Sequence, residues 1–379
     1  MFFYHEPEVD IIIFNSTIGR EDGTDCRFED VNTVLFHKID KCEKMIVVKN
    51  IIRVKKIIMD KTANKKITVI GHANVDVMAC PVDFSKIKAG SQPMEDILVS
   101  YGGGGLNEAV ILKRLGADVE LVSKLADDEA GEQILRFIKS EGISDKGIIM
   151  DTSGTGCTSV NVVLVDNGGE RYFLTNPGGS NRKMENQDIE PLLDTGSDMV
   201  SFAAMFVSPL LDIGALGDIF KVIKARPDRI LAVDMTKPKN GETLEDLKEC
   251  LQYVDYIFPN EEEASMLTGI SDVYENARLF ADAGVKCVII TRGKNGCLIF
   301  KDGKCTEIPP YPVERVVDTT GAGDAFAAGF LYGLSRGLSL EACGRFGNAA
   351  ASCVVEGLGA SYGISAPEKV FKRFEEITV

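Results

Sequence analysis

Short apolar runs alternate with helical patterns from Ile67 to the C-terminus, and this alternation limits the fold more than any other feature of the chain. Helical patterns, for example at 108–115 and 131–140, separate the runs. Because a repeated strand–helix–strand order builds a sheet covered by helices, we predict a three-layer α/β/α domain with a mostly parallel sheet. The candidate strands lie at 67–70, 119–123, 229–234, 256–259 and 286–291.

Two stretches interrupt this alternation, at about 77–101 and 157–176. The second stretch alternates apolar and polar residues and contains Asp-Asn-Gly-Gly at 166–169, a strong signal for a hairpin turn. We therefore predict a small antiparallel β lid over the ligand-binding edge of the main sheet.

Composition excludes several classes of protein. The 379 residues contain no apolar run near the 18 needed to span a bilayer, so no membrane contact is expected. The net charge of −15 repels phosphate backbones, so nucleic acid is not expected as a partner. Ten cysteines without a CxxC pair favour reduced thiols and a cytoplasmic location. Three histidines are too few for a His-rich metal site.

The N-terminal segment differs from the rest of the chain. Residues 1–66 are nearly neutral, whereas the remainder is strongly acidic, and the segment matches neither a secretory signal nor a transit peptide. Met59 stands just before the first strand-like run. We therefore interpret 1–58 as an extension of unknown role, 59–379 as the functional domain and Met59 as its start.

The strongest local signal is VDTTGAGDAF at 317–326. Its Gly-Ala-Gly sequence leads into an apolar helix, and the first N–H groups of such a helix can bind an anion. Asp324 then lies at the mouth of this anion site. It could act as a general base for an incoming hydroxyl, or it could simply cap the helix.

Further polar residues follow glycines or strand ends. Four glycines at 102–105 allow close approach of a ligand, and Asn107 could bind hydroxyls, although such a loop can also be only a turn. Asn74 and Asp76 follow the first strand, where open α/β sheets bind ligands, or they close an Asx turn.

Two segments could contact a nucleotide. The glutamates at 261–263 begin a helix, where they either complement the helix dipole or hold hydrated Mg²⁺ near a triphosphate. Residues 291–296 follow a strand with two glycines, as in an ordinary β-turn or in the wall of a nucleotide pocket.

Together these residues resemble the ribokinase-like, PfkB-type carbohydrate kinases over about residues 67–379. DTTGAGDAF at 318–326 is similar to the C-terminal signature of that family, and GGGGLNEA at 102–109 with RLGADVELVSKLADDEAG at 114–131 is similar to the N-terminal one. The resemblance implies a ribokinase-like domain with a β lid. It also implies transfer of a phosphoryl group from ATP, with Mg²⁺, to a hydroxyl of a small sugar, polyol or nucleoside.

The resemblance also implies roles for single residues. Asp324 becomes the catalytic base, and the backbone amides of Gly321, Ala322 and Gly323 become the anion hole. Acceptor-binding positions are Asn74, Asp76, Gly103, Gly104 and Asn107. Nucleotide-binding positions are Asn260, Thr291, Gly293, Gly296 and Asn348. Metal positions are Glu263 for Mg²⁺ through water, and Asp318 and Thr320, with the loop around 357 and 359, for a monovalent cation such as K⁺.

Two departures from ribokinases concern the acceptor. Gly104 stands where ribokinases carry Lys, and Val207 stands where they carry a sugar-contacting Glu. These departures argue against ribose and favour another sugar, an inositol-like polyol or a nucleoside, and Arg171 could either reach an anionic group or be solvated. A homodimer is a further expectation. The alternatives to a kinase are a non-catalytic sugar or nucleotide sensor and an NAD-dependent dehydrogenase.

Overall fold

The computed structural model describes residues 2–6, 9–13, 65–86, 90–94, 96–166, 171–193, 196–357, 359–360 and 362–376. The chain divides into one unit of residues 1–56 with 379 and another of residues 57–378. In the first unit, β1 (Phe2–Glu6) pairs antiparallel with β2 (Val9–Ile13). Met59 lies outside the described residues, so its assignment as the functional start stays a prediction.

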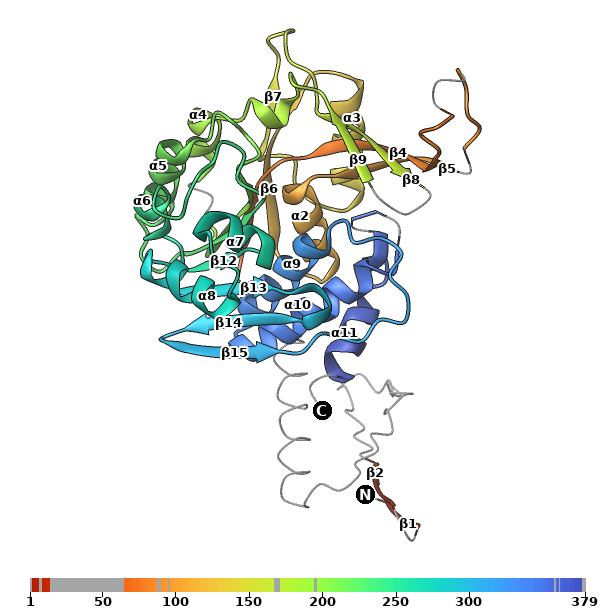
Figure 1. The fold of residues 1–379 in the computed structure, drawn as a ribbon, viewed down its shortest axis with the longest axis vertical. Coiled ribbons are helices and arrows are strands. Elements are labelled where there is room, and N and C mark those ends of the chain that lie inside the picture. The colour runs from red at the N-terminus through yellow and green to blue at the C-terminus, as the bar shows by residue number, and fades with distance from the viewer. Residues whose placement is uncertain are drawn as a thin grey trace, which may run out of the picture. The chain divides into compact units, whose positions relative to one another are not determined.

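The second unit contains a nine-stranded sheet in the order β15-β14-β13-β12-β11-β10-β3-β6-β7 (Figure 1). The pairings from β13 to β7 are parallel, and only the β13–β14 and β14–β15 pairings are antiparallel. The predicted mostly parallel sheet is therefore confirmed. Its strands are β3 (Ile67–Ile70), β6 (Val119–Ala126), β7 (Ile148–Asp151), β10 (Met199–Met205), β11 (Ile230–Met235), β12 (Tyr256–Phe258), β13 (Cys287–Thr291), β14 (Cys297–Lys301) and β15 (Lys304–Ile308).

All five predicted strands occur, and four strands occur that the sequence analysis did not identify, namely β7, β10, β14 and β15. Strands β14 and β15 form a hairpin whose two turn residues, Asp302 and Gly303, both have positive φ. An Asp-Gly pair in this conformation is a typical two-residue hairpin turn.

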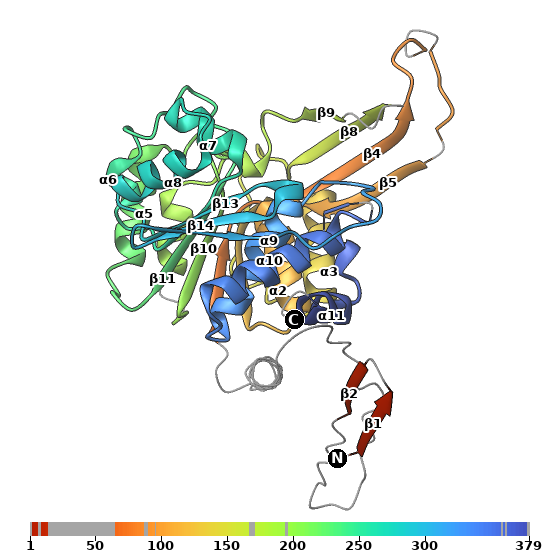
Figure 2. The same cartoon turned by 60° about the horizontal axis from the view of Figure 1, so that its bottom comes forward.

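Helices cover both faces of the main sheet (Figure 2), which confirms the three layers. On one face a buried apolar cluster joins the helices to the sheet through residues such as Phe220, Phe280 and Val233. On the other face Phe258 of the sheet contacts Phe326 and Phe330. The first face carries α5 (Ile213–Ile223), α6 (Lys248–Leu251), α7 (Glu261–Thr268) and α8 (Val273–Asp282). The second carries α2 (Gly104–Arg114), α9 (Ala322–Ser335) and α10 (Leu340–Val354).

The described residues also form α3 (Glu129–Ser140), α4 (Asn186–Ile189) and α11 (Pro367–Glu376). No helix in the described part of the chain is long and apolar enough to cross a membrane.

A separate four-stranded sheet has the order β5-β4-β8-β9. Its outer pairings are antiparallel, and the central pairing of β4 with β8 is parallel. This sheet corresponds to the predicted lid, although it begins at Asn74. Asn74 and Asp76 therefore lie on a strand, and the alternative of an Asx turn at these positions was wrong. The strands are β4 (Asn74–Val82), β5 (Asp96–Gly102), β8 (Val160–Asp166) and β9 (Arg171–Thr175).

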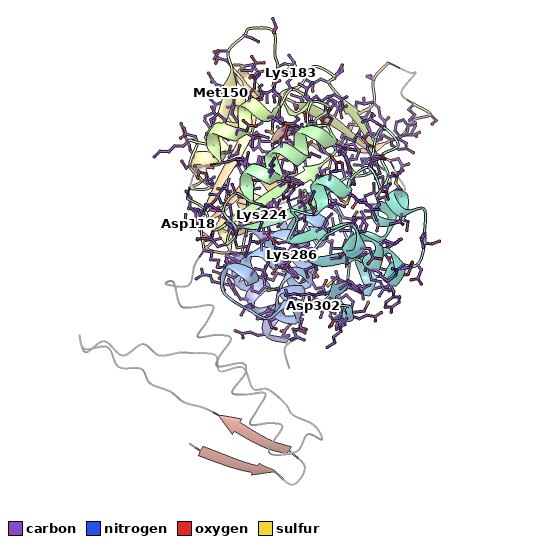
Figure 3. The ribbon with its side chains drawn as sticks, turned by 90° about the vertical axis from the view of Figure 1, so that its left-hand side faces the viewer. Asp118, Met150, Lys183, Lys224, Lys286 and Asp302 are labelled. Carbon is purple, nitrogen blue, oxygen red and sulfur yellow. The ribbon has the colours of Figure 1, made fainter. Side chains whose placement is uncertain are left out.

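A partly buried ion-pair cluster lies at the amino ends of β12 and β13. Both oxygens of Asp255, which precedes β12, are used: Oδ2 accepts from Lys224 Nζ and Oδ1 from Lys286 Nζ, each at 2.7 Å. Lys224 and Lys286 lie close together in Figure 3. Because Asp255 is almost fully buried, removal of a lysine partner would leave a buried carboxylate without full compensation and would destabilise the sheet.

Candidate active site

The start of α9 provides backbone amides for an anion. Gly321 caps the helix with φ 75°, and the amide of Ala322 donates to the Thr319 carbonyl at 3.2 Å. The amides of Gly321 and Gly323 have no acceptor among the described residues. Two of the three predicted anion-hole amides are therefore free, and they point from a helix N-terminus, where negative charge is favoured.

Asp324 lies in the first turn of α9 and is half-buried. Its Oδ2 accepts a hydrogen bond from Asn107 Nδ2 at 2.7 Å, and Oδ1 has no partner among the described residues. Burial raises the pKa of Asp324 to about 6, and the Asn107 hydrogen bond opposes this rise. Asn107 thus fixes the carboxylate through one oxygen and leaves the other able to accept a proton.

The predicted acceptor residues gather at the same place. Asp76 Oδ1 accepts from Asn74 Nδ2 at 2.7 Å and from Asn161 Nδ2 at 2.9 Å. A Cβ on Gly102 would lie 2.5 Å from Asp76 Oδ2 and 3.7 Å from Asn107 Oδ1, an oxygen that is buried without a partner. Asp76 and Asn107 therefore lie next to one another.

Gly103 brings the loop before α2 against the same residues. Its φ is 97°, and a Cβ there would lie 2.7 Å from Asn74 Oδ1 and 2.6 Å from the His72 carbonyl. The amide of Gly104 donates to His72 Nε2 at 3.3 Å, and Gly104 is the first residue of α2 rather than part of the loop. Burial lowers the pKa of His72 to about 4, so its imidazole is neutral.

The predicted nucleotide residues lie along the next two strand ends. Asn260 and Glu263 form a reciprocal capping box at the start of α7, since each side chain accepts the backbone N–H of the other at 2.9 Å. Thr291 forms a backbone bridge to Asn260, which joins the ends of β12 and β13. Gly296 and Asn348 both lie against the segment of Ile308 and Pro309. The side-chain Nδ2 of Asn348 donates to the carbonyl of Pro309 at 2.8 Å.

Gly293 lies in the turn between β13 and β14. It begins a short 3-10 helix with φ 50°, and the amide of Arg292 closes the turn by donating to the carbonyl of Gly296 at 2.8 Å. Space is open around Gly293, where no atom lies within 4 Å of a Cβ position.

Glu263, the predicted Mg²⁺ position, lies in the first turn of α7. Burial raises the pKa of Glu263 to about 7, and one of its oxygens is used by the capping box. No group of three or more His, Cys, Asp or Glu residues within the described ranges is arranged to hold a metal ion. These residues fit a Mg²⁺ ion that is held mainly by phosphates and water.

The Asp318 carboxylate forms hydrogen bonds with the backbone of two loops. Its Oδ1 accepts from the Thr320 amide at 2.6 Å and its Oδ2 from the Gly359 amide at 3.0 Å. These contacts place Asp318, Thr320 and the 359 loop beside one another, as a monovalent-cation site would require.

Two buried carboxyl groups near Asp324 were not anticipated from the sequence. Glu108, in α2, is fully buried, and neither of its oxygens has a hydrogen-bond partner in the described part of the chain. Burial raises the pKa of Glu108 to about 8, with Asp324 adding to the rise and the nearby Ser201 hydroxyl opposing it. Burial and the charges of Asp324, Glu263 and Glu108 also raise the pKa of Asp234.

Replacement of Glu108 by glutamine is expected to change how stability depends on pH. The pKa of Glu108 in the folded protein, about 8, lies above its ordinary value of 4.5. Its contribution to the free energy of unfolding is therefore fully present below pH 4.5 and is lost as the pH rises toward 8. The free energy of unfolding of the Glu108→Gln variant should therefore rise relative to that of the wild type by about 1.4 kcal/mol per pH unit over this range, because glutamine cannot ionise. Tm measured from pH 5 to 9 tests this, and a difference in Tm that does not change with pH contradicts it.

The activity should depend on the ionisation of Asp324. Because its pKa is about 6, the fraction of Asp324 able to take a proton decreases tenfold per pH unit below that value. We expect kcat/KM for the acceptor, measured at saturating ATP, to decrease in the same way, while Tm at pH 5 shows that the protein stays folded. A profile that is flat down to pH 4.5 would exclude Asp324 as the group that titrates.

Comparison with known proteins decides the family. A family model for the pfkB family carbohydrate kinases matches residues 64–367, most of the chain. The chain belongs to this family. It is therefore a phosphotransferase of the carbohydrate-kinase class, and the resemblance inferred from the two signatures is confirmed.

Individual relatives cover most of this carbohydrate kinase. It is 26% identical over 317 residues to the nucleoside kinase of Methanocaldococcus jannaschii, and the aligned region covers 82% of this chain and 97% of that protein. The structure of Arabidopsis thaliana ribokinase complexed with ribose and ATP matches with a TM-score of 0.68 and 25% identity, over 82% of this chain and 99% of that one. The chain spans 55% of the bifunctional ribokinase/ribose-5-phosphate isomerase A of Fructilactobacillus sanfranciscensis, with 29% identity over 319 residues and 81% of this chain covered.

Proposed function

We propose that this carbohydrate kinase transfers the γ-phosphoryl group of ATP to a hydroxyl of a small sugar, polyol or nucleoside. The observation that supports the proposal is that Asn107, which lies beside Asp76, donates a hydrogen bond to Asp324, and that Asp324 is in the same first turn of α9 as the free amides of Gly321 and Gly323. It puts hydroxyl-binding groups, a proton acceptor and an anion site in one place.

In the proposed reaction Asp324 Oδ1 takes the proton of the acceptor hydroxyl. The hydroxyl oxygen forms a bond to the γ-phosphorus while the bond from that phosphorus to the bridging oxygen of ATP breaks, and ADP leaves. The amides of Gly321 and Gly323 stabilise the charge on the moving phosphoryl group. Asn74, Asp76, Gly103, Gly104 and Asn107 orient the acceptor, and Asn260, Thr291, Gly293, Gly296 and Asn348 line the nucleotide site.

Two cations are part of the proposal. Mg²⁺, bound to the phosphates and to Glu263 through water, would neutralise charge on the triphosphate. A monovalent cation such as K⁺ beside Asp318 and Thr320 would order the loop that precedes the Gly321 amide. Asp318 already fixes this loop through the Thr320 amide, which supports the assignment.

We also propose a homodimer and a cytoplasmic location. The side of the small sheet away from Asp76 exposes Ile97, Val99 and Leu174, each more than half accessible, and an apolar face of this kind is usually covered by a partner. The eight cysteines in the described ranges are all free thiols, which supports a reducing compartment. Light scattering of the purified protein gives the oligomeric state directly.

A coupled assay of ADP release tests the proposed function. Pentoses, hexoses, phosphorylated sugars, inositols and nucleosides are each offered with MgATP, with and without K⁺. ADP release that depends on one of these acceptors supports a kinase. Binding of ATP and of an acceptor without ADP release would instead favour the sensor that the sequence also allows.

A further inference from the structure

The small sheet carries an ordered row of polar groups on the side that faces Asp324. Strand pairing places Ser100, Asp76, Asn161 and Thr175 in one line across β5, β4, β8 and β9. Asp76 and Asn161 are hydrogen-bonded to one another, so both side chains lie on the same face. The closeness of Asp76 and Asn107 shows that this face is turned toward Asn107, which is hydrogen-bonded to Asp324.

The next row outward on the same face is entirely apolar. Two residues farther along each strand, pairing aligns Leu98, Met78, Val163 and Phe173. Met78 and Val163 are buried, whereas Phe173 is 54% exposed and Leu98 is 40% exposed. The two exposed side chains lie at the ends of the row, on either side of the buried pair.

The two rows lie roughly 7 Å apart, because side chains on one face of a strand repeat every two residues. A ligand that covers both rows must present hydroxyls to the first and an apolar surface to the second. A free sugar carries hydroxyls around its whole ring, and burying them against the second row without partners would cost free energy. A ribose ring joined to a flat aromatic base has the required order of groups.

We propose that the acceptor is a nucleoside, with its ribose hydroxyls at Asp76 and Asn161 and its base against Phe173 and the neighbouring Val163. This inference rests on the proposed kinase function and names the class of acceptor. Phe173 can stack on any base, since every base has an aromatic face, and Val163 and Met78 continue the apolar row beside it.

Phe173→Thr tests the contact with the base. Threonine keeps the β-propensity of the strand and removes the ring, and loss of one base–aromatic stack should raise KM for a nucleoside tenfold or more, with kcat and the KM for ATP nearly unchanged. Tyr172→Thr is the matched control, because Tyr172 neighbours Phe173 on the same strand but points to the other face. Cytidine, uridine, adenosine, guanosine and ribose serve as acceptors, with ADP release as the readout.

The outcomes separate this inference from the kinase function. A kcat/KM at least tenfold higher for one nucleoside than for ribose, reduced by Phe173→Thr and not by Tyr172→Thr, supports it. Phosphorylation of sugars but not of nucleosides, or an equal effect of Phe173→Thr on ribose and nucleoside, overturns it while the kinase function stands. No ADP release with these acceptors, nor with the hexoses, other pentoses, phosphorylated sugars and inositols of the wider panel, overturns the kinase function itself. If Phe173→Thr does not fold, Phe173→Leu, which keeps an apolar side chain and removes the aromatic ring, provides the same test.

Discussion

Replacement of Asp324 by asparagine is expected to lower kcat by about 10²–10⁴-fold, the size of general-base effects. Asparagine keeps the size of the side chain and still has a carbonyl oxygen to accept from Asn107, so the geometry of the pocket should persist. It lacks a carboxylate to take the proton of the hydroxyl. The loss should therefore appear in kcat, with little change in the dissociation constant of ATP.

Single-turnover kinetics and titration calorimetry with ATP measure the two quantities separately. Asp282→Asn is a suitable control because Asp282 is an exposed carboxylate at the end of α8, where it pairs with Arg278. Turnover of the Asp324→Asn variant near the wild-type rate would remove Asp324 from the chemical step. Loss of ATP binding together with turnover would mean that the substitution disturbs the α9 loop rather than proton transfer.

Replacement of Gly321 by alanine is expected to lower kcat by about 10²-fold or more. The φ of 75° is unfavourable for alanine, and its Cβ would lie 2.5 Å from the Cβ of Ala360 and 2.6 Å from the Ala360 carbonyl oxygen. The backbone at 321 must therefore move. Because removal of a single anion-hole donor costs 10²–10³-fold in other enzymes, displacement of the amides that begin α9 should have a similar effect.

Gly337→Ala is the matched control for this substitution. Gly337 follows the same helix with φ 72°, but no atom lies within 4 Å of its Cβ position. Both variants carry the backbone cost of a left-handed alanine, about 1–2 kcal/mol, and Gly321→Ala adds the clash with Ala360, so it should lose at least as much stability in denaturant unfolding. Only Gly321→Ala should lose turnover. Equal kcat in the two variants would show that the position of the Gly321 amide does not matter.

Local sequence was sufficient for the fold class and for one half of the site. The Gly-Ala-Gly-Asp sequence specifies its own conformation, since a glycine with positive φ followed by a helix start needs no distant partner. Its place at the start of α9, with Asp324 in the first turn, agrees with that pattern. The five predicted strands likewise carry continuous apolar runs, which are characteristic of strands buried on both faces.

The acceptor side of the site was harder to predict because it depends on pairing between distant segments. Asn161 contacts Asp76 only because β4 and β8 pair in parallel, 85 positions apart in the chain. Asn74 and Asp76 alternate with Val75 and Val77, which is a signal for a strand. Their position directly after a first buried strand nevertheless left an Asx turn as one of the two alternatives. Strand β10 was missed because its serine and alanines interrupt the apolar run.

The buried carboxyl groups could not be predicted from the sequence. Glu108 stands among polar and apolar residues of α2, and glutamate is common on exposed helix faces. Its burial follows from the packing of α2 between the main sheet and α9, a tertiary arrangement that no local pattern specifies. This burial is the main cause of the raised pKa of Glu108, and Ser201 and Asp324, which come from different elements, modify it.

A crystal structure with an acceptor and a non-hydrolysable ATP analogue bound together is the most direct test of the assignment of Asp324. We predict that an Asp324 oxygen lies about 2.6–3.2 Å from the acceptor hydroxyl, with the terminal phosphate at the amides of Gly321 and Gly323. A complex in which the terminal phosphate lies away from these amides, or in which Asp324 faces away from the hydroxyl, would contradict it.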